Sequence, residues 1–245
     1  MGGGVQCRCG GGLGGGVGIT VASAAEARRE RDLAARRFSE VRQLANVFLF
    51  DVEQKIRDIP GATDARELLV NTSLGYLDRL AADAGNDPSL LRELAGGYDR
   101  LGDVQGALLQ ANLGQSDAAL SSYLKASALR ARLAAGGSVA DIAALREGAR
   151  GELKLSNAML RVAKLKEAAA HSKLALDLLT RIAPSPEDQD AVLRERAEAM
   201  TTHGYIVAVN GDIDGAIVLL RQAKTLYETL PPARLSETSS APATR

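Results

Sequence analysis

The chain has 245 residues, of which 46% are apolar and 24% charged, and its 30 basic and 30 acidic side chains leave no net charge. This length allows one sizeable domain or two small ones, and the apolar content favours a folded chain. The lack of net positive charge argues against a nucleic-acid-binding protein, which is typically basic overall or on one face. Aromatic residues make up only 3% and Trp is absent, so the composition favours helices over strands.

The only cysteines are Cys7 and Cys9. Two thiols one residue apart cannot complete a four-ligand zinc site, and they cannot form a framework of disulfides. Neither His171 nor His203 has a cysteine or a second histidine at metal-binding spacing. We therefore expect no metal site and no cofactor.

Residues 1–22 are predicted to be a glycine-rich disordered tail or the remnant of a membrane span. Ten of the first eighteen residues are glycine, which loses more conformational entropy on folding than any other residue. No charged residue occurs from Cys9 to Ala25, a length near the lower limit for a span, but the glycines weaken the drive for insertion. The G-x-G-x-x-G matches in this tract follow no predicted strand, so they do not indicate a nucleotide-binding loop.

Residues 23–230 are predicted to form antiparallel helical hairpins. Residues 25–59 contain neither Gly nor Pro and carry an apolar stripe at helical spacing. The sequence "PGAT" ends this helix, and Thr63, followed four residues later by Glu67, is typical of the N-cap of the next one.

The second predicted helix ends near "AGNDP", and further helices follow to about Ile182. A last pair is predicted at about 190–210 and 212–230. Residues 231–245 are rich in Pro, Ser, Thr and Ala and are predicted to be a disordered tail.

One pattern of small residues occurs three times along these hairpins. A glycine or alanine is followed five residues later by an alanine, four residues after that by a variable residue, and three residues after that by another alanine. Small residues let two helix axes approach to about 8 Å, and a larger residue fills the gap beside the contact. The occurrences, spaced by 49 and then 48 residues, are Gly114, Ala119, Tyr123 and Ala126; Ala163, Ala168, Ser172 and Ala175; and Gly211, Ala216, Leu220 and Ala223.

This pattern resembles the tetratricopeptide repeat, an antiparallel helix pair with small residues where the two helices touch. A matching first helix precedes each occurrence, with a small residue at Gly102, Ser156 and Gly204. The ordinary repeat has 34 residues, so the repeats here are elongated. The resemblance implies an all-α fold, a tetratricopeptide-like right-handed solenoid of about four elongated helical hairpins.

The segment from Arg36 to Gly106 resembles part of one bacterial protein family. The residues that carry this resemblance are "LANVFLFD", "PGAT", "YLDRLA" and "GDVQG", followed by "ANLG". The family consists of membrane-anchored serine/threonine protein kinases with an upstream kinase domain, a single span, a basic juxtamembrane helix and a C-terminal tetratricopeptide region. The resemblance covers about Arg28 to Leu230 and implies a signalling module of the kind that follows such a kinase. Full-length relatives would be membrane-associated, whereas the chain as given is expected to be soluble unless a missing upstream span exists.

The residues that phosphoryl transfer needs are missing from the sequence. It contains no V-A-I-K, no H-R-D catalytic loop and no D-F-G, and it therefore lacks the catalytic and Mg²⁺-binding aspartates. The carboxylates alternate with arginines as on solvated helix faces, and no G-x-S-x-G is present. His203 is expected to be a structural histidine and His171 to be exposed. We expect no enzymatic activity and no catalytic residue.

Function is therefore expected to reside on the surface of the hairpins. Stacked hairpins form a concave groove lined mainly by the first helix of each pair. A side-chain amide beside an arginine can hold the carboxylate or the backbone of a peptide. The alternative for each position is a solvated face without a dedicated ligand. The predicted partner-binding residues are Arg92, Asp99, Asn157, Arg161, Thr201 and Tyr205.

These patterns predict a protein-interaction or sensor module, of the type found C-terminal to a bacterial receptor-like kinase, that binds a protein or peptide partner. The alternative is a free-standing tetratricopeptide adaptor or chaperone-like scaffold. A kinase reading frame directly upstream would favour the first of these two.

Overall fold

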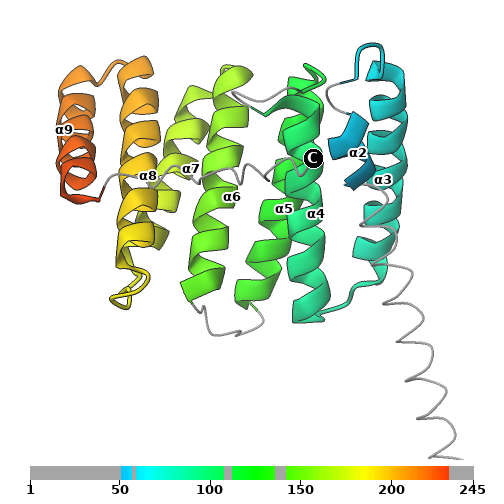
Figure 1. The fold of residues 1–245 in the computed structure, drawn as a ribbon, viewed down its shortest axis with the longest axis horizontal. Coiled ribbons are helices and arrows are strands. Elements are labelled where there is room, and N and C mark those ends of the chain that lie inside the picture. Colours follow the sequence, from blue (N-terminus) through cyan, green and yellow to red (C-terminus); the bar gives the residue numbers. More distant parts are fainter. Residues whose placement is uncertain (1–50, 57–58, 108–111, 136–141, 232–245) are drawn as a thin grey trace, which may run out of the picture. The chain divides into compact units, whose positions relative to one another are not determined.

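The computed structural model describes residues 51–56, 59–107, 112–135 and 142–231 (Figure 1). The chain separates into two compact units, Met1–Gln54 and Lys55–Arg245, and the second unit holds nearly all of the described residues. The predicted tail at 1–22 and most of the predicted helix at 25–59 lie outside the described residues. The predicted tail at 231–245 lies outside them as well, apart from Pro231.

Every regular element in the described ranges is a helix, which confirms the predicted all-α class for this part of the chain. These helices are α2 (Val52–Ile56), α3 (Thr63–Asp83), α4 (Pro88–Gly106), α5 (Ser116–Ala135), α6 (Ile142–Arg161), α7 (Leu165–Thr180), α8 (Gln189–Val209) and α9 (Ile213–Thr229).

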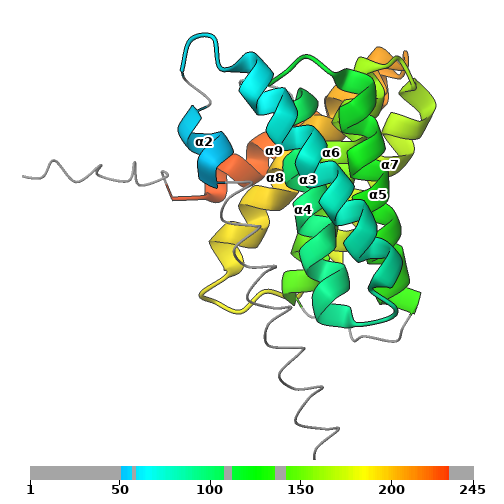
Figure 2. The same cartoon turned by 90° about the vertical axis from the view of Figure 1, so that its right-hand side faces the viewer.

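Within Lys55–Arg245, helices α3 to α9 stand side by side in chain order (Figure 1). The closest packing occurs within three hairpins, formed by α4 with α5, α6 with α7, and α8 with α9. The first helices of successive hairpins also meet, because α4 contacts α6 and α6 contacts α8. Seen from the α3 end, α5 and α7 lie on one side of α4 and α6 (Figure 2).

The recurring small residues lie where these helices touch. Ala119, Ala168 and Ala216 are all buried, as the spacing predicts. The first-helix glycine at 102 is equally constrained, because a Cβ there would lie 2.5 Å from the ring of Tyr123. Any side chain at this position would separate α4 from α5, so the close contact of the hairpin requires glycine.

The turns inside the last two hairpins share one backbone geometry. Ala163 has φ 60° and Gly211 has φ 97°, both in the left-handed region. In the first turn Lys164 N–H donates to Met159 O at 2.9 Å, and in the second Asp212 N–H donates to the carbonyl five residues earlier at 3.2 Å. This bond pattern is the Schellman motif, in which the left-handed residue is normally glycine.

The predicted N-cap of α3 is wrong by one residue. Thr63 is the first residue of the helix, and the capping position is Ala62, which makes no side-chain cap bond. The preceding turn sets this register, because Gly61 has φ 79° and Ala62 N–H bonds back to Ile59 O at 3.2 Å. Side-chain caps do occur at Asp87, which accepts from two N–H groups of α4, and at Asp212, which accepts from an N–H group of α9.

The two histidines lie at contacts between helices. His203 is partly buried, with Nδ1 2.8 Å from the hydroxyl of Ser172 on α7. Burial lowers the pKa of this imidazole, and the nearby Lys173 lowers it further, against an opposing effect of Asp177. His171 is not the exposed residue that the sequence predicts, because it is partly buried with Nδ1 2.5 Å from Glu152 Oε2. The sequence of α7 alone does not show that a glutamate on α6 reaches this ring.

Replacing Ala163 with glycine is expected to stabilise the protein. An alanine in the left-handed region strains the folded state by about 1–2 kcal/mol, and glycine removes this strain. The greater conformational freedom of glycine in the unfolded chain offsets about 0.4–1 kcal/mol of the stability gained in this way. The expected net gain is about 0.5–1 kcal/mol in the free energy of unfolding, measured by urea denaturation.

The reverse change at the equivalent turn is the matched control. A Cβ at Gly211 would meet no atom within 4 Å, so Gly211→Ala tests the backbone alone. It should lower the free energy of unfolding by a similar amount. If both changes shift stability in the same direction, left-handed strain is not the cause.

The free energy of unfolding is expected to fall as the pH drops from neutral through the ordinary histidine pKa of 6.5. His203 has its pKa lowered by folding, so the unfolded chain binds a proton more readily than the folded chain does. The stability due to the neutral ring is therefore complete above about pH 6.5 and is lost below it. His203→Gln, which retains a hydrogen-bonding group for Ser172, should flatten this pH dependence in thermal unfolding. An unchanged slope would assign the effect to other groups.

Candidate partner-binding surface

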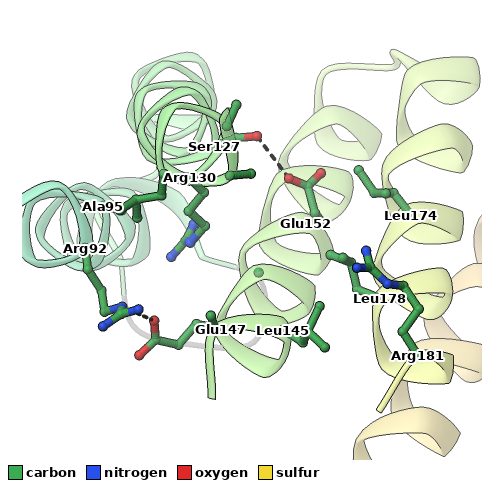
Figure 3. Close-up of a pocket in the computed structure, with 15 residues that line it drawn as sticks. Arg92, Ala95, Ser127, Arg130, Leu145, Glu147, Glu152, Leu174, Leu178 and Arg181 are labelled. Carbon is green, nitrogen blue, oxygen red and sulfur yellow. Dashed lines mark hydrogen bonds and ion pairs between the residues drawn. The ribbon is translucent and has the colours of Figure 1, made fainter. Parts of the chain in front are cut away.

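A cavity of about 520 Å³ lies between the α4–α5 hairpin and the α6–α7 hairpin (Figure 3). Its wall is mainly apolar, with small residues such as Ala131 and Ala144 and the leucines Leu145, Leu174 and Leu178. A cavity of this size is within the range that accepts a small molecule or a few side chains of a partner.

Polar pairs surround this cavity, and two of them are drawn in Figure 3. Arg92 Nε lies 3.7 Å from Glu147 Oε2, joining α4 to α6 across the edge of the cavity. Ser127 Oγ donates to Glu152 Oε1 at 2.9 Å, joining α5 to α6. These contacts pair the Glu147 and Glu152 carboxylates, whereas Arg181, which also lines the cavity, is exposed.

The deepest ion pair beside the cavity joins Arg130 of α5 to Asp99 of α4. The guanidinium lies over Gly151 of α6, where a Cβ would overlap it. The sequence predicts Asp99 on an open surface that faces a partner, but the structure does not place it there. It is only 8% exposed because Arg130 covers its carboxylate.

A second, smaller pocket of about 100 Å³ lies along the contact between α4 and α6. We define the α4–α6 site as Asp103, Lys154, Asn157 and Arg161, which line this pocket together with Tyr123 of α5. The Tyr123 hydroxyl donates to Asp103 Oδ1 at 2.8 Å, and Lys154 Nζ lies 2.6 Å from Asp103 Oδ2. Burial and the Asp103 carboxylate raise the pKa of the Tyr123 phenol, so Tyr123 stays a neutral donor.

Arg161 is the charge in the α4–α6 site that remains available to a partner. Its Nε donates to Ser116 Oγ at 3.1 Å, which fixes one edge of the guanidinium. Within the described residues it forms no ion pair, and its side chain is exposed. Asn157 lies one helical turn away in the same pocket. A guanidinium beside a carboxamide can bind a carboxylate through several donated hydrogen bonds.

The structure brings together only some of the predicted partner-binding residues. Asn157 and Arg161 line the same pocket, whereas Arg92 lies at the larger cavity. Thr201 and Tyr205 are exposed on α8 and line neither pocket, and the Thr201 hydroxyl donates to its own helix at Ala197 O.

Asp103 and Lys154 were not predicted. A signal for Asp103 was present, because it directly follows Gly102, as Asn157 follows Ser156 and Tyr205 follows Gly204. Residues after the small residue therefore occupy equivalent positions on the first helices. Lys154 carries no such signal, since its role depends on the distance to Asp103, 51 residues earlier.

The described residues include no group of three His, Cys, Asp or Glu side chains that could hold a metal ion. None of the helices in these ranges is long and apolar enough to cross a membrane. No model of a known protein family matches the chain, and no curated protein matches it.

Removing the carboxylate of Asp99 is expected to destabilise the fold strongly. Asp99→Ala leaves the Arg130 guanidinium without its partner in a site where both side chains are less than one-fifth exposed. Breaking a buried pair of this kind costs about 3 kcal/mol, measured as the free energy of unfolding in urea.

The matched control is the half-exposed pair between Arg92 and Glu147. Glu147→Ala should cost no more than about 0.5 kcal/mol, because water screens an exposed pair. Equal effects of the two substitutions would contradict the assignment of Asp99 as a structural residue.

Proposed function

We propose that the hairpins form a tetratricopeptide-like solenoid and that the α4–α6 site binds an acidic group of a protein or peptide partner. Two observations support the repeat. Small residues are buried at equivalent contacts in each hairpin, and Gly114, Ala163 and Gly211 share a left-handed backbone at equivalent positions. First helices that contact one another in succession supply a continuous binding surface in such a fold.

The observation that carries the binding proposal is the guanidinium of Arg161. Asp103 cannot repel an acidic ligand strongly, because Lys154 pairs with it and Tyr123 donates to it. Arg161 and Asn157 then present donors to a pocket of about 100 Å³. A side-chain carboxylate or a C-terminal carboxylate of a peptide fits this chemistry.

We propose that this binding serves signalling, as a non-enzymatic sensor module of the kind that follows a bacterial receptor-like serine/threonine kinase. The support is the resemblance of Arg36–Gly106 to the C-terminal region of those kinases. A kinase reading frame directly upstream of the gene would agree with this role. Its absence would favour a free-standing adaptor, and the α4–α6 site would be unaffected by that outcome.

The binding proposal is tested with a display library of random peptides that have free C-termini, selected on the full chain. Peptides that are enriched should carry a glutamate, an aspartate or an exposed terminal carboxylate. Arg161→Glu should weaken their binding at least about tenfold, equivalent to about 1.4 kcal/mol, measured by fluorescence anisotropy.

The matched control is Lys173→Glu, which makes the same charge reversal on an exposed side chain of α7. Lys173 pairs with Asp177 at 3.0 Å within its own helix and lies outside the α4–α6 site. The control should retain binding, and both variants should have equal helicity by circular dichroism. Loss of binding in the Lys173 variant alone would place the binding surface on α7.

A further inference from the structure

The cavity between the α4–α5 and α6–α7 hairpins lies at a junction that recurs one hairpin later along the row. At the first junction Glu147 of α6 lies 3.7 Å from Arg92 of the preceding first helix, α4. At the second junction Glu195 of α8 pairs with Arg146 of the preceding first helix, α6, at 2.9 Å. The two glutamates are 48 residues apart, which is the spacing of the last two occurrences of the repeat pattern. They therefore mark equivalent positions.

The residue after each glutamate differs between the two junctions. At the second junction it is Arg196, whose guanidinium reaches the end of α7 and donates to Leu179 O at 3.0 Å and to Ile182 O at 2.6 Å. At the first junction it is Gly148, which lines the cavity and has no side chain to occupy it. The cavity therefore lies where the chain omits a long side chain that it uses at the equivalent position of the next hairpin.

An apolar chain fits the space beside Gly148. Leucines and alanines of α4, α5, α6 and α7 form most of the wall, among them Leu145, Leu174 and Leu178. Leu174 is 44% exposed, so the cavity opens to solvent and a small molecule can enter it. Burying an apolar chain against such a wall is favourable in proportion to the area removed from water.

Arg181, the residue after α7, differs from the other charged groups that line the cavity. Its side chain is exposed, and within the described residues its guanidinium forms no hydrogen bond or ion pair. Figure 3 shows it on the same side of the cavity as Leu174 and Leu178. A guanidinium can donate two parallel hydrogen bonds to a carboxylate. The other lining charges have partners within the protein: Arg92 with Glu147, Arg130 with Asp99, and Glu152 with Ser127 and His171.

We propose that this cavity binds a small amphipathic monocarboxylate, with its apolar chain beside Gly148 and its carboxylate on Arg181. The leucine and alanine wall favours an apolar chain, and the unpaired guanidinium selects an anionic end over a cationic one. This cavity and the pocket of the α4–α6 site share no lining residue, so the proposal does not depend on the peptide-binding function.

Isothermal titration calorimetry of the full chain with straight-chain monocarboxylates tests the proposal. Affinity should rise about fourfold with each methylene added from butyrate to octanoate, equivalent to about 0.8 kcal/mol per methylene. Octanoate should bind at least about fivefold more tightly than octanol, equivalent to about 1 kcal/mol, because only the acid pairs with Arg181. Absence of octanoate binding at millimolar concentrations, or equal affinities for the acid and the alcohol, would overturn the proposal.

Arg181→Gln should remove the preference for octanoate over octanol while leaving octanol binding unchanged. The matched control is Arg132→Gln, because Arg132 has the same repeat position on α5 but donates to Gly85 O and does not line the cavity. The control should keep the wild-type preference. If the preference survives in the Arg181 variant, the carboxylate does not lie on this guanidinium and the proposal is wrong.

Gly148→Gln tests the cavity itself, because it places a long uncharged side chain at the position equivalent to Arg196. Binding of both octanoate and octanol should weaken at least about tenfold, equivalent to about 1.4 kcal/mol. Glycine is unfavourable inside a helix, so this variant should be no less stable than the wild type in urea.

Arg161→Glu separates this cavity from the α4–α6 site and should leave octanoate binding unchanged. If Arg161→Glu abolishes octanoate binding and Gly148→Gln does not, the acid binds at the α4–α6 site. That result would overturn the cavity proposal while agreeing with the proposed function.

Discussion

The close approach of paired helices at small side chains is the constraint on which the rest of this structure depends. At Ala119, Ala168 and Ala216 a methyl group is all that separates one helix from its partner, and at Gly102 even a methyl group would strike Tyr123. Alanines occupy the points where the helices touch and leucines fill the space beside them, so the buried core is made mainly of these two residue types. Each hairpin packs chiefly on its neighbours, and stability is spread along the row instead of residing in one central cluster.

Polar side chains at these contacts fix how one helix lies on the next. Arg130 reaches Asp99, Glu152 binds both Ser127 and His171, and the Ser172 hydroxyl meets His203. Two helix faces lined with alanine could pack equally well after one helix shifts by a turn along the other. A buried polar group would lose its partner in such a shift, so the polar contacts fix the register. The same contacts explain why a charged residue on a first helix is not automatically a binding residue. Asp99 has its partner within the protein, whereas Arg161 keeps its guanidinium at the surface.

The sequence predicts well the features that depend on local spacing. The helix pairs and the buried alanines follow from steps of three, four and five residues, which determine the face on which each residue lies. The misassigned residues are those whose surroundings come from distant segments. Arg130 lies 31 residues after Asp99, and Glu152 lies 19 residues before His171, so neither contact leaves a periodic signal. Thr63 has the composition of a cap, but the turn at Gly61 sets the register and puts Ala62 in its place.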